Sequence, residues 1–365
     1  MSSKKTRETN IEILRIISIL LIICFHYVYK SNYHYSELNL NTILVKSIWF
    51  LGELGVNVFI LITGYYLSKS KASIRKVVLL ILEVMFYNIL LCFIGNIINV
   101  NTFIGSPLIL FPIILSRYWF VTCYILIYIL SPFYNILINC FNKRSYQKFL
   151  IITIFIWCII PTFFGVIYNN TEMLLFYNRF IWLTIMYFIG AYIRNYGIKF
   201  FVSKKTSLLT FGVTYFSMVL SIFVIYLISK NGAIELAYLW TPNNVLMLIL
   251  SISMFMFFKE LKIKSNKVIN KLATTTLGIY LLHDGPLASN MWKNIFHNDI
   301  VIYTDIFIIH ILGSAFTIFA VGVIIDFIRQ IIEKYTVRKI LDLKIWGKLY
   351  SDLKTDAETI LDKYV

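Results

Sequence analysis

The chain has 365 residues, of which 59% are hydrophobic and only 14% are charged, and its mean hydropathy is +0.77. A soluble domain is closer to half apolar, so this composition excludes an ordinary soluble protein and predicts that lipid covers part of the surface. The net charge of +16 lies mostly between apolar runs, and this distribution argues against a nucleic-acid-binding protein.

Ten apolar segments within residues 1–330 are each about long enough to cross ~30 Å of hydrocarbon. They are residues 11–30, 43–67, 77–99, 118–141, 149–168, 173–194, 207–229, 243–259, 272–291 and 304–328. The apolar stretch 103–115 is short and contains Pro107 and Pro112, so we expect a re-entrant or interfacial segment there. Residues 331–365 mix apolar and charged residues at helical spacing, which predicts a cytoplasmic amphipathic tail.

Basic residues orient this bundle. With the N-terminus inside, the inner segments hold 27 of the 34 Lys and Arg residues, and the outer segments hold six. The positive-inside rule therefore predicts an all-α polytopic membrane protein of about ten transmembrane helices, with both termini in the cytoplasm.

The first span contains an arginine, Arg15, and a histidine, His26. Eleven helical steps place them about 20° apart around the axis and about 16–17 Å apart along it, so they share one face. Arg15 alone could be an interfacial anchor, and His26 alone could be a hydrogen-bonded core histidine. Together on one face, they favour the two ends of a ligand path.

The second span contains Glu53 in its middle and Thr63 and Gly64 near its inner end. A carboxylate inside the membrane needs a partner, and Glu53 is a candidate for orienting His26. A structural hydrogen bond between helices is the alternative. Small residues such as Thr63 and Gly64 allow a helix or a ligand to approach closely. Arg75 and Lys76 follow on the inner side, where Arg15 also lies.

Two later spans add further polar and aromatic residues. The fourth span contains Trp119, Tyr128 and Pro132. The ninth contains Tyr280, and then His283 and Asp284 before Gly-Pro, which indicates a broken, polar part of the helix. We expect His283 to be either a substrate contact or a structural group. Three further residues, read as loop or interface residues, lie nearer the outer face: Arg179, His297 and His310.

These residues resemble the motifs of the acyltransferase family 3 membrane proteins, which O-acetylate bacterial surface polysaccharides. The family's Arg-x₁₀-His signature is matched by Arg15 and His26, and its F-F-x-x-S-G-[FY] motif by "VFILITGYYL". The W-S-L-x-x-E-x-x-x-Y-x-x-x-P motif is matched except that Tyr124 replaces the glutamate. The late Tyr-x-x-His motif is matched by Tyr280 and His283, and the basic inner loop only loosely. The resemblance covers about residues 7–330 and implies a ten-helix bundle.

The resemblance also implies a function, which is transfer of an acyl group, with acetyl expected, from cytoplasmic acyl-coenzyme A to an extracytoplasmic saccharide. In this hypothesis Arg15, Arg75 and Lys76 hold the donor phosphates, Thr63 and Gly64 approach the donor, and His26 is the general base with Glu53 beside it. Trp119, Tyr128, Tyr280 and His283 contact the substrate, and no metal is required. The site would lie in the plasma membrane. An acyl-histidine intermediate stays open, and a flippase for a lipid-linked sugar is the alternative function.

Overall fold

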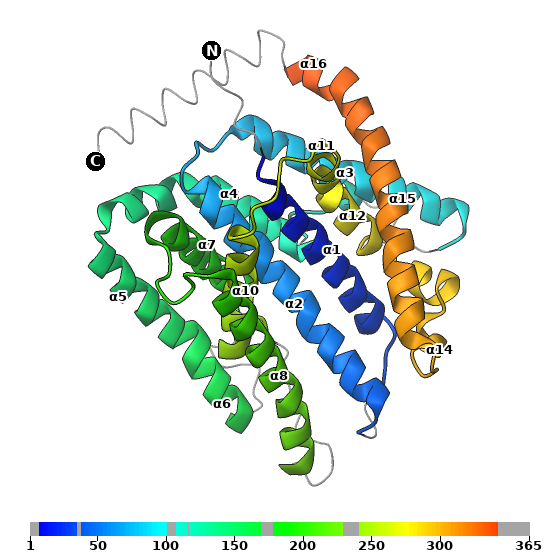
Figure 1. Ribbon diagram of the computed structural model, residues 1–365. Coiled ribbons are helices and arrows are strands. Elements are labelled where there is room, and N and C mark those ends of the chain that lie inside the picture. The colour runs from blue at the N-terminus through cyan, green and yellow to red at the C-terminus, as the bar shows by residue number, and fades with distance from the viewer. Residues whose placement is uncertain are drawn as a thin grey trace.

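The computed structural model describes residues 7–34, 38–100, 107–115, 117–168, 178–228 and 241–341, and all regular structure in these ranges is helical (Figure 1). The first half contains α1 (Thr9–Tyr29), α2 (Leu40–Leu67), α3 (Ile74–Ile97), a 3₁₀ turn (Pro107–Leu110), α4 (Trp119–Cys140), α5 (Lys143–Ile154), a π-turn (Phe155–Ile159) and α6 (Ile160–Tyr168). The second half contains α7 (Arg179–Tyr196), α8 (Lys204–Ile228), α10 (Val245–Lys259), α11 (Lys267–Leu272), a 3₁₀ turn (Ala273–Thr275), α12 (Thr276–His283), α13 (Ala288–Asn290), a second π-turn (Met291–Ile295), α14 (Asn298–Val301), α15 (Phe307–Tyr335) and α16 (Val337–Leu341).

The predicted all-α membrane bundle is confirmed. Among the described residues, seven helices are long and apolar enough to cross a membrane, and these are residues 9–29, 40–67, 74–97, 119–140, 143–164, 204–224 and 307–339. The other three expected spans coincide with α7, with the shorter α10 and with the broken segment from α11 to α13. The count of ten crossings therefore stays a prediction.

The segment before α4 does not cross the bundle. Its residues 107–115 form a 3₁₀ turn and further turns. The Asn88 side chain donates to the Ile109 carbonyl at 2.6 Å, and the Thr122 hydroxyl donates to the Ile113 carbonyl at 3.0 Å. These bonds hold the segment against α3 and α4, so the backbone groups of a non-helical stretch find partners inside the protein.

Asparagines set where several helices begin. The side chains of Asn39, Asn142, Asn178 and Asn244 each accept a hydrogen bond from the backbone N–H three residues later, at the first turns of α2, α5, α7 and α10. This is the capping geometry that asparagine favours, because its side chain satisfies a donor that the helix leaves unpaired. At the other end of α7, Gly197 adopts φ 64°, which a residue with a side chain rarely adopts.

Helix α2 lies at the centre of the bundle and packs against α1, α7 and α10. Two glycines bring α2 and α7 together. A Cβ atom on Gly64 would lie 2.1 Å from the Tyr187 carbonyl oxygen, and one on Gly190 would lie 2.4 Å from the Leu61 carbonyl oxygen. Backbone therefore meets backbone at this crossing, as small residues permit in membrane helices.

This crossing predicts a large effect of a small substitution. In Gly64→Ala the new methyl group would meet the backbone of α7, which cannot rotate away as a side chain could, so α2 and α7 must separate. Overpacking of this kind costs about 1–3 kcal/mol. We expect the purified protein to melt at a lower temperature in detergent. Gly212→Ala in α8 is the matched control, because nothing lies within 4 Å of its added Cβ. Equal melting temperatures for both variants would contradict the close crossing.

Helix α1 begins and α15 ends at the same end of the bundle, at the top of Figure 1. We call this the inner end, because the charge count predicts that it faces the cytoplasm. Arg329 of α15 is buried there and forms ion pairs with Glu83 at 3.2 Å, with Asp326 at 2.6 Å and with Glu333 at 2.5 Å. Helix α15 continues past the expected domain boundary at residue 330, and residues 342–365 of the predicted tail lie outside the described residues.

Candidate active site

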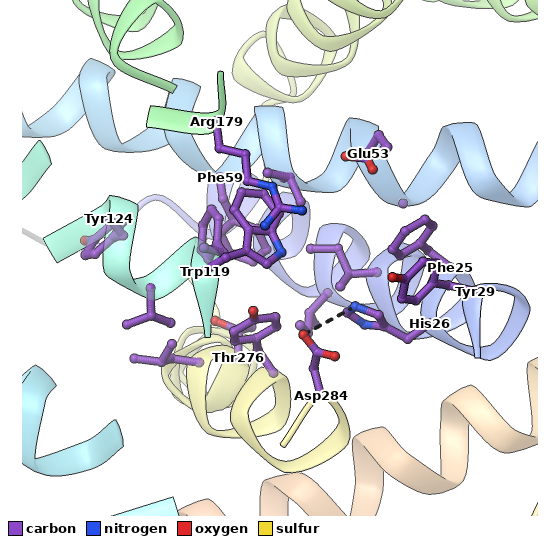
Figure 2. A pocket seen from close by; sticks show the side chains of 18 of the residues that line it. Phe25, His26, Tyr29, Glu53, Phe59, Trp119, Tyr124, Arg179, Thr276 and Asp284 are labelled. Carbon is purple, nitrogen blue, oxygen red and sulfur yellow. Dashed lines mark ion pairs between the residues drawn. The ribbon is translucent and has the colours of Figure 1, made fainter. Parts of the chain in front are cut away.

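A cavity of about 520 Å³ lies between α1, α2, the start of α4, the start of α7 and α12, and we call it the central cavity (Figure 2). Its polar lining residues are Arg15, His26, Tyr29, Lys30, Trp49, Glu53, Thr63, Arg117, Trp119, Tyr124, Arg179, Thr276, Tyr280 and Asp284. A cavity of this size that combines apolar walls with polar groups is typical of a small-molecule site.

One face of α1 forms a long wall of this cavity. Arg15, Ile19, Ile22 and His26 line it at intervals of three or four residues, as one helical face requires. The structure therefore brings Arg15 and His26 to the same cavity, with Arg15 nearer the inner end. Arg15 also forms an ion pair with Glu12 at 3.7 Å, one turn earlier on α1.

A second histidine holds His26 in place. The His26 Nδ1 lies 2.9 Å from the His283 Nε2, and the His283 Nδ1 lies 2.6 Å from the Ile279 carbonyl oxygen. A carbonyl oxygen only accepts, so a neutral His283 carries its hydrogen on Nδ1 and accepts at Nε2. His26 must then donate from Nδ1, which leaves the lone pair on its Nε2. This chain of bonds fixes the form in which His26 can take up a proton.

The acid beside His26 is Asp284. Its Oδ2 lies 3.5 Å from the His26 Nε2, and its Oδ1 lies 3.6 Å from the Lys30 ammonium. Helix α12 ends at His283, and Asp284 follows with non-helical backbone angles before Gly285 and Pro286. The break in the helix turns the Asp284 carboxylate into the cavity (Figure 2).

Glu53, which the sequence suggested as the partner of His26, lies elsewhere on the wall. It projects from α2 across the cavity from Asp284 (Figure 2), and no hydrogen bond or ion pair joins it to His26 in the part of the chain that the structure describes. Glu53 is not the partner because the end of α12, and not α2, lies beside the Nε2 atom of the His26 imidazole. No contact with His26 therefore supports the predicted catalytic role of Glu53.

Only some of the other candidate residues from the sequence line the central cavity. Thr63, Trp119 and Tyr280 line the central cavity. His283 is fully buried behind His26, where it positions the imidazole and does not line the cavity, and Gly64 lies at the α2–α7 crossing. Helix packing therefore accounts for Gly64, and the contact with His26 accounts for His283.

Lys76 and Tyr128 line a second cavity of about 450 Å³ toward the inner end, which we call the inner cavity. Arg7, Arg329 and Arg338 also line it, whereas Arg75 is exposed and lines neither cavity. Tyr124 and Leu80 line both cavities, so the two spaces adjoin at these side chains.

Sequence reasoning missed three groups in the central cavity. Asp284 was visible as the acid of a His-Asp-Gly-Pro stretch, but its contact with His26 depends on how α12 packs against α1. Arg179, read as a loop or interface residue, lies over the Trp119 ring with its guanidinium carbon 4.5 Å from the ring centre. Phe25, Tyr29 and Trp49 form an aromatic cluster beside His26, with ring centres 5.0–5.6 Å apart.

Comparison with known proteins identifies the family. The family model of acyltransferase family 3, described as an acyltransferase domain, matches residues 8–327. No match to the chain was found among curated proteins or among solved structures. The matched range contains every helix that lines the central cavity, from α1 through α12. The chain therefore belongs to the acyltransferase family 3, and it is a membrane acyltransferase.

Proposed function

We propose that the chain transfers an acyl group, with acetyl expected, from cytoplasmic acyl-coenzyme A to a hydroxyl group of an extracytoplasmic saccharide, in the plasma membrane. The observation that supports this most directly is the central cavity itself. It has a cation, Arg15, nearer its inner end and an imidazole with a free lone pair, that of His26, about 16–17 Å further along α1. Donor phosphates and a thioester at the end of a flexible arm fit these two positions.

In the proposed reaction, His26 acts as the general base. The acceptor hydroxyl gives its proton to the His26 Nε2 while its oxygen attacks the thioester carbonyl carbon. The carbon–sulfur bond then breaks, and the departing thiolate of coenzyme A takes the proton from the His26 Nε2. Asp284, 3.5 Å from that nitrogen, stabilises the imidazolium that exists between the two proton transfers.

The donor enters from the inner end in this proposal. Arg15 binds donor phosphate in the central cavity, and Lys76 does so in the adjoining inner cavity, with Thr63 and Tyr124 between them. A guanidinium is suited to phosphate because it presents paired donors in one plane. Arg75 lines neither cavity, so in this proposal it adds to the positive charge of the inner surface.

The acceptor occupies the half of the cavity around His26. Tyr280 and the aromatic cluster of Phe25, Tyr29 and Trp49 offer flat apolar surfaces beside His26, and Trp119 lines the cavity further away. Aromatic faces suit the apolar faces of sugar rings, while the cavity's polar groups can hydrogen bond with sugar hydroxyls. This arrangement supports a saccharide acceptor.

The decisive experiment compares surface glycans from cells with and without the gene by mass spectrometry. We expect acyl esters on glycan hydroxyls only where the protein is present. The purified protein in proteoliposomes should then transfer the label of acetyl-coenzyme A to the de-acylated glycan. Movement of a lipid-linked saccharide across the membrane without gene-dependent acylation would instead support a flippase.

Arg15→Ala should weaken donor binding. Arg15 is the cation nearest the inner end of the central cavity, and a charge-assisted contact with phosphate contributes about 1.5–3 kcal/mol, so we expect about 10–100-fold weaker binding of acetyl-coenzyme A. Isothermal titration of the purified protein measures the dissociation constant. Arg144→Gln is the control, because Arg144 is exposed at the start of α5 and lines neither cavity. Unchanged donor affinity in Arg15→Ala would remove Arg15 from the donor site.

A further inference from the structure

Arg179 is an exposed cation at the start of α7, and it lines the central cavity. Two other cations that line this cavity have ionic partners, since Arg15 contacts Glu12 at 3.7 Å and the Lys30 ammonium contacts Asp284 at 3.6 Å. Arg179 instead lies over the Trp119 ring at 4.5 Å, and it forms no ion pair with any residue that the structure describes. Glu53 lines the same cavity and feels the charge of Arg179, but no ion pair joins the two among the described residues.

Helix stability does not explain an arginine at this position. Arg179 is the first residue of α7, and the N-terminal end of a helix carries partial positive charge, which disfavours a cation there. The guanidinium and the helix end therefore add charge of the same sign at one side of the cavity. Stacking on Trp119 fixes the plane of the guanidinium and leaves its N–H donors available to a ligand.

The position of Arg179 separates it from the donor phosphates. Arg194, at the other end of α7, lies over the Tyr65 ring at 4.7 Å, near the inner end of α2. Fifteen helical steps place Arg179 about 22 Å from that end along α7. Figure 2 shows Arg179 and Trp119 on one side of the cavity, and Asp284 and His26 together on the other side. A ligand that reaches both Arg179 and His26 must lie across the half of the cavity assigned to the acceptor.

We propose that the acceptor is an anionic saccharide whose carboxylate or phosphate group binds Arg179 while its reacting hydroxyl lies at the His26 Nε2. This inference rests on the proposed function and adds the substrate class. A paired guanidinium–anion contact fixes the acceptor in both position and orientation. Glu53, between Arg179 and His26 on the α2 wall, accepts hydrogen bonds from the remaining sugar hydroxyls.

The test is a double-mutant cycle between the protein and its acceptor. The glycan acylated by this protein in cells is isolated, de-acylated with mild alkali and divided into three samples. One stays native, one has its carboxylates reduced to hydroxymethyl groups, and one has its phosphates removed with hydrogen fluoride. Wild-type protein and Arg179→Gln in proteoliposomes are compared on each sample with acetyl-coenzyme A as donor.

We expect Arg179→Gln to lower kcat/KM on the native glycan by about 10–100-fold, mainly through KM. On the sample that has lost the recognised anion, the two proteins should differ by less than about threefold, because the contact is already absent. If reduction of the carboxylates abolishes the loss of kcat/KM in Arg179→Gln, the recognised anion is a carboxylate. If removal of the phosphates abolishes it, the anion is a phosphate. Arg179→Lys should retain part of the preference for the native glycan over the sample without the anion, since lysine keeps the positive charge but lacks the planar pair of donors.

Three results would overturn this inference while leaving the proposed function in place. The acylated glycan could contain no acidic group, Arg179→Gln could have no effect, or its penalty could be equal on all three samples. The last result would assign Arg179 to the reacting carbonyl group. Absence of any gene-dependent acylation would overturn the proposed function itself. Arg144→Gln is again the control and should match the wild type on every sample.

Discussion

Replacement of His26 by alanine should lower the rate of acyl transfer by about 10²–10⁴, the usual loss when a general base is removed. Donor binding should change little, because in the proposed function the phosphates bind Arg15 and Lys76 and not the imidazole. His26→Gln should be no better, since glutamine keeps a hydrogen bond and cannot take up a proton at neutral pH. The measurement is acetyl transfer to the de-acylated glycan, with protein amount checked by immunoblot and donor affinity by titration.

His34→Ala is the matched control for this prediction. His34 is exposed, lies outside both cavities and offers only its backbone N–H to Tyr303. Its replacement should leave the transfer rate unchanged. A well-expressed His26→Ala protein with near-normal transfer would rule out His26 as the base. His283 could not simply take its place, because both of its ring nitrogens are already engaged, with His26 and with the Ile279 carbonyl.

Replacement of Asp284 by asparagine should have the second largest effect. At 3.5 Å and an effective dielectric constant of about 20, a carboxylate stabilises an imidazolium by about 4–5 kcal/mol. Lys30, 3.6 Å from the other carboxylate oxygen, offsets part of this stabilisation. We therefore expect Asp284→Asn to slow transfer by about 10–10³-fold at saturating donor, with the loss in kcat rather than in donor affinity.

Glu53→Gln provides the comparison that separates the two acids. Asp284 faces the His26 Nε2, whereas Glu53 has no hydrogen bond or ion pair with His26 among the described residues, so Glu53→Gln should cost less in kcat than Asp284→Asn. Both variants keep the size of the side chain and remove only its charge. A larger loss of kcat in Glu53→Gln would show that Glu53 becomes the partner of His26 when substrates are bound.

Much of the fold could be predicted from the sequence because membrane helices are determined locally. A run of about 20 apolar residues must form a helix in hydrocarbon, since its backbone groups have no other partners there. The predicted segments 11–30, 43–67 and 118–141 agree with α1, α2 and α4 to within a few residues. The shared face of Arg15 and His26 also follows from the helical repeat alone, and the structure places both residues on the wall of one cavity. The relative positions of two residues on one helix can therefore be predicted without tertiary information.

Contacts between helices could not be predicted in this way. The sequence offered Glu53 as the acid near His26 in depth and marked Asp284 only as part of a broken, polar stretch, but depth does not determine which helix faces the Nε2 side of the ring. That choice depends on how α12 is rotated and where it breaks after His283. The same rotation buries His283 behind His26, so His283, which the sequence left as either a substrate contact or a structural group, orients the His26 imidazole.

The sequence by itself determined the class of protein, the helical segments and the face of α1 that carries Arg15 and His26, because each depends on composition or on a repeat within one segment. The tertiary structure decided the pairing of His26 with His283 and Asp284, the packing of Gly64 against α7 and the position of Arg179 over Trp119. Each of these depends on the rotation and separation of two helices, which follow from the packing of many side chains at once and cannot be read from any one segment.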